Sequence, residues 1–380
     1  LRSEAELLTI DIALVVRRPA AFHAAQAIRR RSEEADGWTD KLGPTLIASA
    51  QRLAELAGAG RLVLFLGAGV SVGAGLPAWG ELLSMLTTDL GIVPGGTDKE
   101  EWAKLSYLDI AQLIQSEIER LRSLDPSAPT LGERIAAILA SYERHALAHG
   151  LLASIPIDEL VTTNYDTLME SAIEGAGRRV SILPYAPSRA GQGWLLKLHG
   201  CLKHSDDIVL TRSDFLRYDD RRAALRGIVQ AMLMTRHMLF VGFGLQDDNF
   251  HRIAEDVRKA IGSKIDDASG DQTFGSYLTL SPKAWLQRLW SRDLNWIELG
   301  VGSQDPEAPR RLEAFLDYVS LQAADSGSHL LDPDFDGALE PGEKRLADRL
   351  RAFVSQTSED ERGSVAWQRI AAVLESLGAD

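Results

Sequence analysis

The fold can be predicted from residues 63–79, which read VLFLGAGVSVGAGLPAW. An apolar run typical of a buried strand leads straight into a glycine-rich turn, and helical spacing of apolar residues follows. Glycine lets the backbone approach a ligand closely, and the N–H groups at a helix start favour an anion. The stretch therefore predicts a strand, a phosphate-binding turn and a helix, in that order. A tight turn that holds no ligand is the alternative.

The turn departs from the two commonest phosphate-binding motifs. It has no Lys-Ser or Lys-Thr pair, which argues against a nucleoside triphosphatase with a Walker A loop. Its glycines, Gly67, Gly69 and Gly73, follow the spacing G-x-G-x-x-x-G, one residue longer than the usual dinucleotide fingerprint. The chain also lacks a strand ending in Asp or Glu about 20 residues later, where that fingerprint binds ribose. A conventional dehydrogenase is therefore not expected.

Further short apolar runs predict a parallel sheet. They lie at residues 158–163, 194–200, 237–244, 276–281 and 295–299. Helical patterns separate most of these runs, and such alternation is typical of an α/β fold. We therefore expect a Rossmann-like parallel sheet with helices on both faces.

The pattern along the chain divides it into three regions. Residues 1–56 are expected to form an N-terminal helical extension, and residues 303–380 a C-terminal helical region. The sheet domain is expected at residues 57–302, with a helical insert at about 91–153.

Individual helices can be predicted within these regions. Residues 43–60 have a clear helical pattern that ends at glycine, whereas residues 6–16 fit a helix or a strand equally well. In the insert, two helices are expected at 100–122 and 131–153.

Composition excludes several classes of protein. The 380 residues carry a net charge of −13, which argues against direct binding of nucleic acid. Cys201 is the only cysteine, so neither a disulfide framework nor a cysteine zinc site can form, and we expect a cytoplasmic protein. The sequence has no apolar run of the roughly 18 residues that a transmembrane helix needs and no secretory signal pattern.

Two predicted strands end in polar residues suited to chemistry. The run at 158–163 is followed by Asn164 and Asp166, and the run at 194–200 ends at His199. Ligands of open α/β sheets lie beyond the carboxyl ends of the strands, so these side chains and the glycine turn should meet. Each also has a purely structural alternative: helix capping by Thr167 and Glu170 after the first strand, and a buried histidine without function in the second.

A third strand end carries glycines and acidic residues. Gly242 and Gly244 close the run at 237–244, and Asp247, Asp248 and Asn249 begin the next helical pattern. This end could face ribose hydroxyls or adenine. The alternative is that an aspartate only caps the helix.

Together these motifs resemble the sirtuin family. The matching stretches are GAGVSVGAGLP at 67–77, TTNYD at 162–166, KLHG at 197–200 and VGFG at 241–244, and they follow the order of the family. The resemblance implies NAD binding in the sheet domain and cleavage of the bond between nicotinamide and ribose.

The sequence departs from the protein-deacylating sirtuins in two ways. Its single cysteine cannot supply their four-cysteine zinc module, and AWGELL, which follows GLP, lacks their arginine. It resembles instead the zinc-free branch of bacterial antiviral defence, in GLPAW at 75–79, TTNYDTLME at 162–170, LTRSDFLRY at 210–218 and VGFGLQDDN at 241–249. This resemblance implies an NAD hydrolase that depletes NAD during infection, needs no metal and forms a homo-oligomer. The short region after residue 302 suggests a separately encoded activator, such as a hexameric DNA translocase or helicase or a short Argonaute.

The resemblance also assigns roles to residues. Asn164, His199 and Asp166 would be catalytic, with Asn164 holding ribose and water and His199 accepting a proton. The predicted NAD-binding residues are Gly67, Ala68, Gly69, Ser71, Thr163, Gly242, Gly244 and Asp248. Two alternatives stay open: protein deacylation or ADP-ribosyl transfer, and a non-enzymatic subunit that binds NAD or ADP-ribose within a defence complex.

Overall fold

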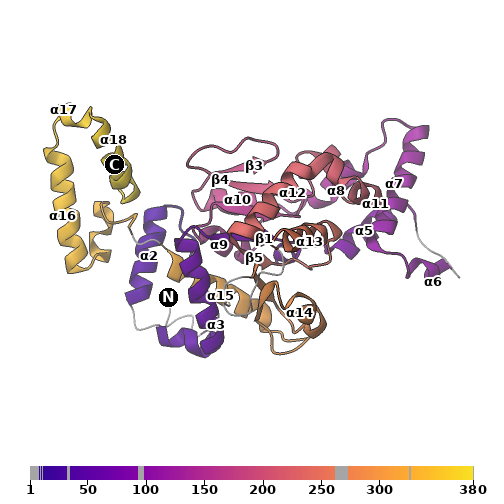
Figure 1. Ribbon diagram of the computed structural model, residues 1–380, viewed down its shortest axis with the longest axis horizontal. Coiled ribbons are helices and arrows are strands. Elements are labelled where there is room, and N and C mark those ends of the chain that lie inside the picture. The colour runs from indigo at the N-terminus through magenta and orange to yellow at the C-terminus, as the bar shows by residue number, and fades with distance from the viewer. Residues whose placement is uncertain are drawn as a thin grey trace.

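The computed structural model is built on one sheet of parallel strands (Figure 1). It describes residues 8, 10, 12–31, 35–92, 98–261, 273–324 and 327–379. The strands are β1 Leu62–Leu66, β2 Glu159–Thr162, β3 Val180–Leu183, β4 Gly193–Lys197, β5 His237–Val241, β6 Gly275–Thr279 and β7 Leu294–Glu298. They pair in the order β3-β4-β2-β1-β5-β6-β7, and every pair is parallel. The predicted Rossmann-like α/β fold is confirmed.

Six of these strands coincide with the apolar runs of the sequence, and β3 does not. It is a four-residue strand at the edge of the sheet, paired only with β4, and most of its residues are half-buried. An edge strand of this kind does not need a continuous apolar run, which is why the sequence pattern did not predict it.

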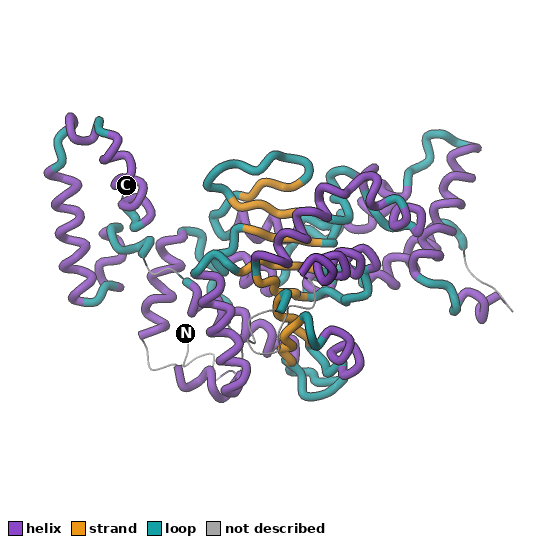
Figure 2. Tube along the Cα trace, in the orientation of Figure 1, coloured by secondary structure: helices purple, strands orange, loops and turns teal. Residues whose placement is uncertain are grey.

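Helices cover both faces of the sheet, as Figure 2 shows. One apolar core joins the strands to α3 (Ala35–Gly58), α9 (Leu147–Ser154), α10 (Leu168–Gly175) and α15 (Ala308–Ala323). The core on the opposite face uses α12 (Tyr218–Thr235), α13 (Asp248–Ile261) and α14 (Ala284–Trp290). Because α3 and α15 bury apolar side chains in the same core, helices from both predicted extensions contribute to the packing of the sheet.

The N-terminal region contains α2 (Pro19–Arg31) before α3. The predicted helix at 43–60 corresponds to the second part of α3, which kinks at Gly43, where φ is +74° and Pro44 follows. Of the segment at 6–16, the described residues 12–16 form neither a helix nor a strand.

Several helices lie between β1 and β2. They begin with α5 (Trp79–Asp89), and the region expected to form the insert, at about 91–153, contains α6 (Asp98–Trp102), α7 (Tyr107–Leu124) and α8 (Leu131–Leu139). The single helix expected at 131–153 is wrong, because α8 ends at Leu139 and α9 begins at Leu147. The two helices pack in different places: α8 buries Ile135 and Leu139 within the insert, and α9 buries Leu152 against the sheet.

The C-terminal helices lie apart from the sheet, on the side of the molecule opposite the insert (Figure 1). They are the 3-10 helix η3 (Pro333–Ala338), α16 (Pro341–Gln356), α17 (Glu359–Arg362) and α18 (Val365–Ser376), and they enclose a small apolar cluster of their own. Across the described ranges, no helix has both the length and the apolar character needed to span a membrane.

Candidate functional site

The glycine turn after β1 packs directly against the turn after β5. The N–H groups of Gly67 and Gly69 donate to the carbonyls of Val241 and Gly242, at 3.0 and 2.9 Å. A Cβ atom on Gly67 would lie 2.5 Å from the Gly242 oxygen, and Gly242 itself has a φ of +65°. These glycines are therefore required by contact between two loops, whether or not a ligand is bound.

Most backbone N–H groups of the predicted pyrophosphate-binding turn already have acceptors within the protein. Besides Gly67 and Gly69, Val70 and Ser71 donate their N–H groups to the carbonyls of Gly67 and Ala68, at 3.1 and 3.0 Å, within a short helix α4 (Gly69–Val72). Within residues 67–71, Ala68 is the one residue whose backbone N–H has no acceptor in the described part of the chain. Binding of pyrophosphate by this turn stays a prediction, and it requires some of these bonds to be exchanged.

Asn164 lies at the end of β2 and is anchored through its amide nitrogen. Its Nδ2 donates to the Gly67 carbonyl at 3.1 Å and to Ser71 Oγ at 3.3 Å. Its backbone N–H donates to Thr162 Oγ1 at 3.0 Å. The Oδ1 atom is buried and has no hydrogen-bond partner within the described part of the chain. The structure thus fixes the side chain and leaves its acceptor available.

A buried network joins Ser71, His149 and Asp166 beside Asn164. Ser71 Oγ donates to Asp166 Oδ2 at 2.9 Å and lies 3.4 Å from His149 Nε2. Since His149 Nδ1 accepts the Ala146 N–H at 3.3 Å, the ring proton belongs on Nε2, which donates to Ser71. Burial lowers the pKa of His149 to about 4, against an opposing effect of Asp166, so the ring is neutral near pH 7.

The direction of these hydrogen bonds excludes a serine nucleophile. In a Ser-His-Asp hydrolase the histidine accepts the serine proton and the aspartate binds the histidine. Here His149 donates to Ser71, and Ser71 donates to Asp166. With Asn164 as a second donor, the Ser71 hydroxyl uses its one proton and both lone pairs inside the protein. Ser71 therefore positions Asn164 and Asp166, and the hydroxyl predicted for NAD binding is occupied in this structure.

A buried lysine on β4 supports the loop that carries Asn164 and Asp166. Lys197, which is 1% exposed, forms an ion pair with Glu170 at 2.8 Å and donates to the Asp166 carbonyl. The structural alternative, a capping box formed by Thr167 and Glu170, is wrong: Thr167 makes no side-chain cap, and Asp166 Oδ1 instead accepts the Leu168 N–H at 3.0 Å. The sequence predicted neither this role of Lys197 nor that of His149. The sequence feature that could have indicated the role of Lys197 is its position as a charged residue within the apolar run at 194–200.

His199 lies at the end of β4 and is 3% exposed. The Leu198 N–H donates to the Thr162 carbonyl at 2.9 Å, so this strand end lies beside that of β2. His199 Nε2 is 3.0 Å from Asp247 Oδ2, and Phe215 and Tyr218 meet the ring edge-on. Its Nδ1 is buried and has no partner among the residues described.

Asp247 belongs to the strand end that was expected either to face ribose hydroxyls or adenine or to cap a helix, and in the structure it has two roles. Its Oδ1 accepts the Phe250 N–H at 2.9 Å, so it does cap α13, and its other oxygen binds His199. Burial alone would raise the pKa of the Asp247 carboxyl, but His199 and the N–H groups of the helix start outweigh burial, and the pKa is lowered. The carboxylate is therefore charged and holds the imidazole in one orientation.

The remaining predicted NAD-binding residues are more exposed than His199. Gly242, Gly244 and Asp248 are exposed on the loop and helix start after β5, and Thr163 is half-buried after β2. Next to Asp248, Asn249 is 4% exposed and its Nδ2 has no partner among the residues described. The predicted site thus combines exposed residues with the half-buried Asn164 and the buried His199. In the described ranges, no three His, Cys, Asp or Glu side chains gather closely enough to hold a metal ion.

Comparison with known proteins finds similarity over part of the chain. Residues 158–284 match the family model described as SIR2-like domain, and this segment contains three of the four motifs. The chain is 30% identical over 214 residues to NAD(+) hydrolase ThsA of Enterococcus faecium, covering 55% of this chain and 42% of that protein. It is 27% identical over 205 residues to NAD(+) hydrolase ThsA of Bacillus cereus (strain MSX-D12), covering 52% and 40%.

A further relative is defense-associated sirtuin 2 of Bacillus subtilis, which is 24% identical over 233 residues, 57% of this chain and 21% of that protein. The matches thus cover less than half of the length of these three relatives. The fold and the motif positions agree with this similarity: residues 158–284, which match the SIR2-like domain model, form part of the Rossmann-like parallel sheet and of the helices on it.

Proposed function

We propose that this protein hydrolyses NAD to nicotinamide and ADP-ribose. One observation carries the proposal: Asn164 Oδ1 and His199 Nδ1 lie at neighbouring strand ends, both buried and both without a partner among the residues described. A buried polar atom left unpaired costs about 1–3 kcal/mol, and a bound substrate would satisfy both atoms. The similarity to proteins named NAD(+) hydrolase supports NAD as that substrate.

The geometry gives each residue a chemical role. In NAD the leaving group is already cationic, so departure of nicotinamide needs no acid, and the protein has to hold the ribose and direct water. Asn164 donates through Nδ2 to the protein, which leaves Oδ1 to accept from a ribose hydroxyl or the attacking water. His199 donates its Nε2 proton to Asp247, which leaves Nδ1 as the base that takes a proton.

We further propose that the protein is a cytoplasmic defence effector that depletes NAD in abortive infection. The defence relative and the single buried cysteine support this setting. In this proposal the enzyme forms a homo-oligomer and responds to a separately encoded activator, such as a DNA translocase or a short Argonaute. No metal takes part in the reaction.

The test is NAD consumption by the purified chain, alone and with the product of the neighbouring gene. Chromatography should show nicotinamide and ADP-ribose in equal amounts. Asn164→Ala and His199→Ala should each lower turnover by about a hundredfold or more, because each removes a group that contacts the reacting atoms. Asn295→Ala and His329→Ala are matched controls, since both residues lie outside the site.

Three results would contradict the proposal. Full turnover in both Asn164→Ala and His199→Ala would exclude this mechanism. Transfer of labelled ADP-ribose to protein without free ADP-ribose would instead indicate a transferase. NAD binding without nicotinamide release, with and without the partner, would indicate a regulatory subunit.

A further inference from the structure

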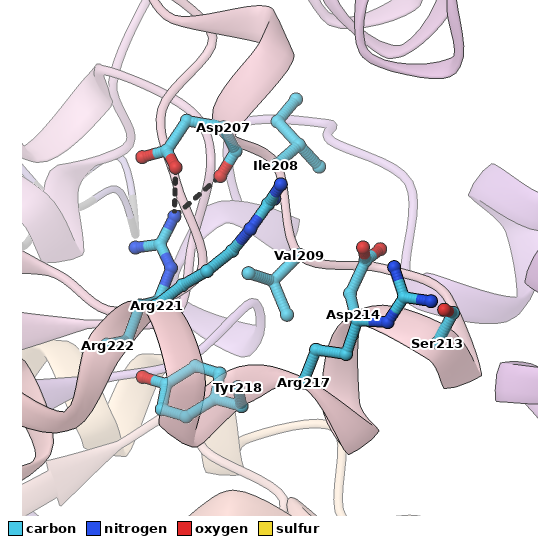
Figure 3. A pocket seen from close by; sticks show the side chains of 9 residues that line it. All are labelled: Asp207, Ile208, Val209, Ser213, Asp214, Arg217, Tyr218, Arg221 and Arg222. Carbon is cyan, nitrogen blue, oxygen red and sulfur yellow. Dashed lines mark hydrogen bonds and ion pairs between the residues drawn. The ribbon is translucent and has the colours of Figure 1, made fainter.

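A cavity of about 80 Å³ lies behind His199, between η1 (Ser205–Asp207), α11 (Arg212–Leu216) and the start of α12. Figure 3 shows the side chains that line it. Three arginines, Arg217, Arg221 and Arg222, and two aspartates, Asp207 and Asp214, are among these residues. The lining therefore has a formal charge of +1, in a chain whose net charge is −13.

Both aspartates already have partners in the protein. Asp207 Oδ1 forms an ion pair with Arg222 at 2.7 Å, and its Oδ2 accepts the Tyr185 hydroxyl at 2.7 Å. Asp214 Oδ2 caps α11 by accepting from the N–H and the hydroxyl of Thr211, at 2.9 and 2.8 Å. Arg222 is 5% exposed and also donates to the Leu198 carbonyl at 3.0 Å. These three groups build the wall of the cavity.

The other two arginines, Arg217 and Arg221, do not form such contacts with the wall of the cavity. Arg217 extends toward Ser213 and Arg221 toward Ile208, along two sides of the cavity (Figure 3). Neither guanidinium has a hydrogen bond or an ion pair with any residue that the structure describes. A guanidinium binds phosphate oxygens in pairs through its planar set of N–H donors. We propose that this cavity binds a phosphoryl group, held by Arg217 and Arg221, at a site separate from that of NAD.

The cavity, with a volume of about 80 Å³, has room for a phosphoryl group. The group could be inorganic phosphate or the terminal phosphate of a monoester. Both present the same anionic phosphate oxygens to the arginines.

The wall of the cavity also holds the strand end of His199. The Val209 N–H donates to the His199 carbonyl at 2.9 Å, and the Tyr218 hydroxyl donates to the Leu198 carbonyl at 3.2 Å. The Tyr218 ring meets the His199 ring edge-on, with centroids 6.1 Å apart. An anion in the cavity therefore acts on the residues that place His199. This effect on turnover rests on the proposed function, whereas phosphate binding itself does not.

The experiment is calorimetric titration of the full chain with inorganic phosphate, at constant ionic strength set by chloride. We expect saturable binding that Arg217→Gln with Arg221→Gln weakens by about tenfold or more, because charge-assisted hydrogen bonds are lost. Arg345→Gln with Arg349→Gln is the matched control: these are exposed arginines with the same spacing, on α16. AMP in place of phosphate distinguishes the sources, since tighter binding of AMP assigns the site to a monoester and weaker binding to free phosphate.

Three outcomes would overturn the proposal. They are the absence of phosphate binding to the intact chain, equal binding by the Arg217 and Arg221 double variant, and displacement of the bound phosphate by NAD. None of them depends on NAD turnover, so failure of this proposal and failure of the proposed hydrolase activity can be told apart.

Discussion

Asn164 and His199 lie at neighbouring strand ends, yet the protein holds them in different ways. The Asn164 side chain binds the Gly67 carbonyl and Ser71, and its loop is supported by Lys197. The polar contact of the His199 ring is with Asp247, and aromatic rings supply the rest of its surroundings. One group is thus fixed by a network from several elements and the other by a single carboxylate.

The difference indicates which property each support controls. A network of buried hydrogen bonds contributes to the free energy of unfolding as well as to geometry, so removing a member should affect stability first. A single carboxylate that sets the tautomer and orientation of a base should affect turnover first. Substitutions on each side can test this comparison.

The largest effect is expected from Lys197→Met. Removing the buried ammonium leaves Glu170 charged and partly buried and the Asp166 carbonyl unpaired, which should lower the free energy of unfolding by about 3–5 kcal/mol. Urea unfolding measures the loss. Lys197→Met with Glu170→Gln should recover part of it, because the second substitution removes the uncompensated charge. If Lys197→Met keeps the stability of the parent chain, Lys197 does not support the Asn164 side.

The next effect is expected from Asp247→Asn. The amide can still cap α13 through its oxygen, so stability should change little, but it no longer holds the imidazole with a charge. Turnover should fall by about a hundredfold, with little change in KM and an altered pH profile. Steady-state kinetics across pH measures this.

Asp293→Asn is the matched control for charge removal. Asp293 is also a buried carboxylate, 8% exposed, and it forms an ion pair with Arg258 at 2.7 Å outside the site. This variant should lose stability and keep its turnover. Equal losses of turnover in the two variants would mean that Asp247 has no special role at His199.

The sequence predicted the strands better than it predicted these contacts. Continuous apolar runs are enough to indicate buried strands, and the motifs placed Asn164 and His199 at their ends. The partners His149, Lys197 and Asp247 come from α9, β4 and the loop after β5. Which of their atoms meet depends on how these elements pack, and residue spacing does not contain that information. For the same reason, the sequence did not show that the glycine turn would bind another loop.

The smallest effect is expected from the titration of His149. Its pKa is about 4 in the folded protein, compared with an ordinary value of 6.5, because the ring is buried. Between these values the unfolded chain binds a proton that the folded chain does not, so stability falls as the pH falls from about 6.5 to about 4. From pH 7 to pH 5, His149 alone should cost about 2 kcal/mol of unfolding free energy.

Urea unfolding of the parent chain and of His149→Gln at both pH values isolates this contribution. His329 remains in both proteins, and burial lowers its pKa as well, so its effect cancels in the difference. The substituted chain should lose less stability on acidification, by the amount that His149 contributes. An equal pH dependence in the two proteins would mean that His149 is not held neutral. The assignment of its Nε2 proton to Ser71, and with it the exclusion of a serine nucleophile, would then fail.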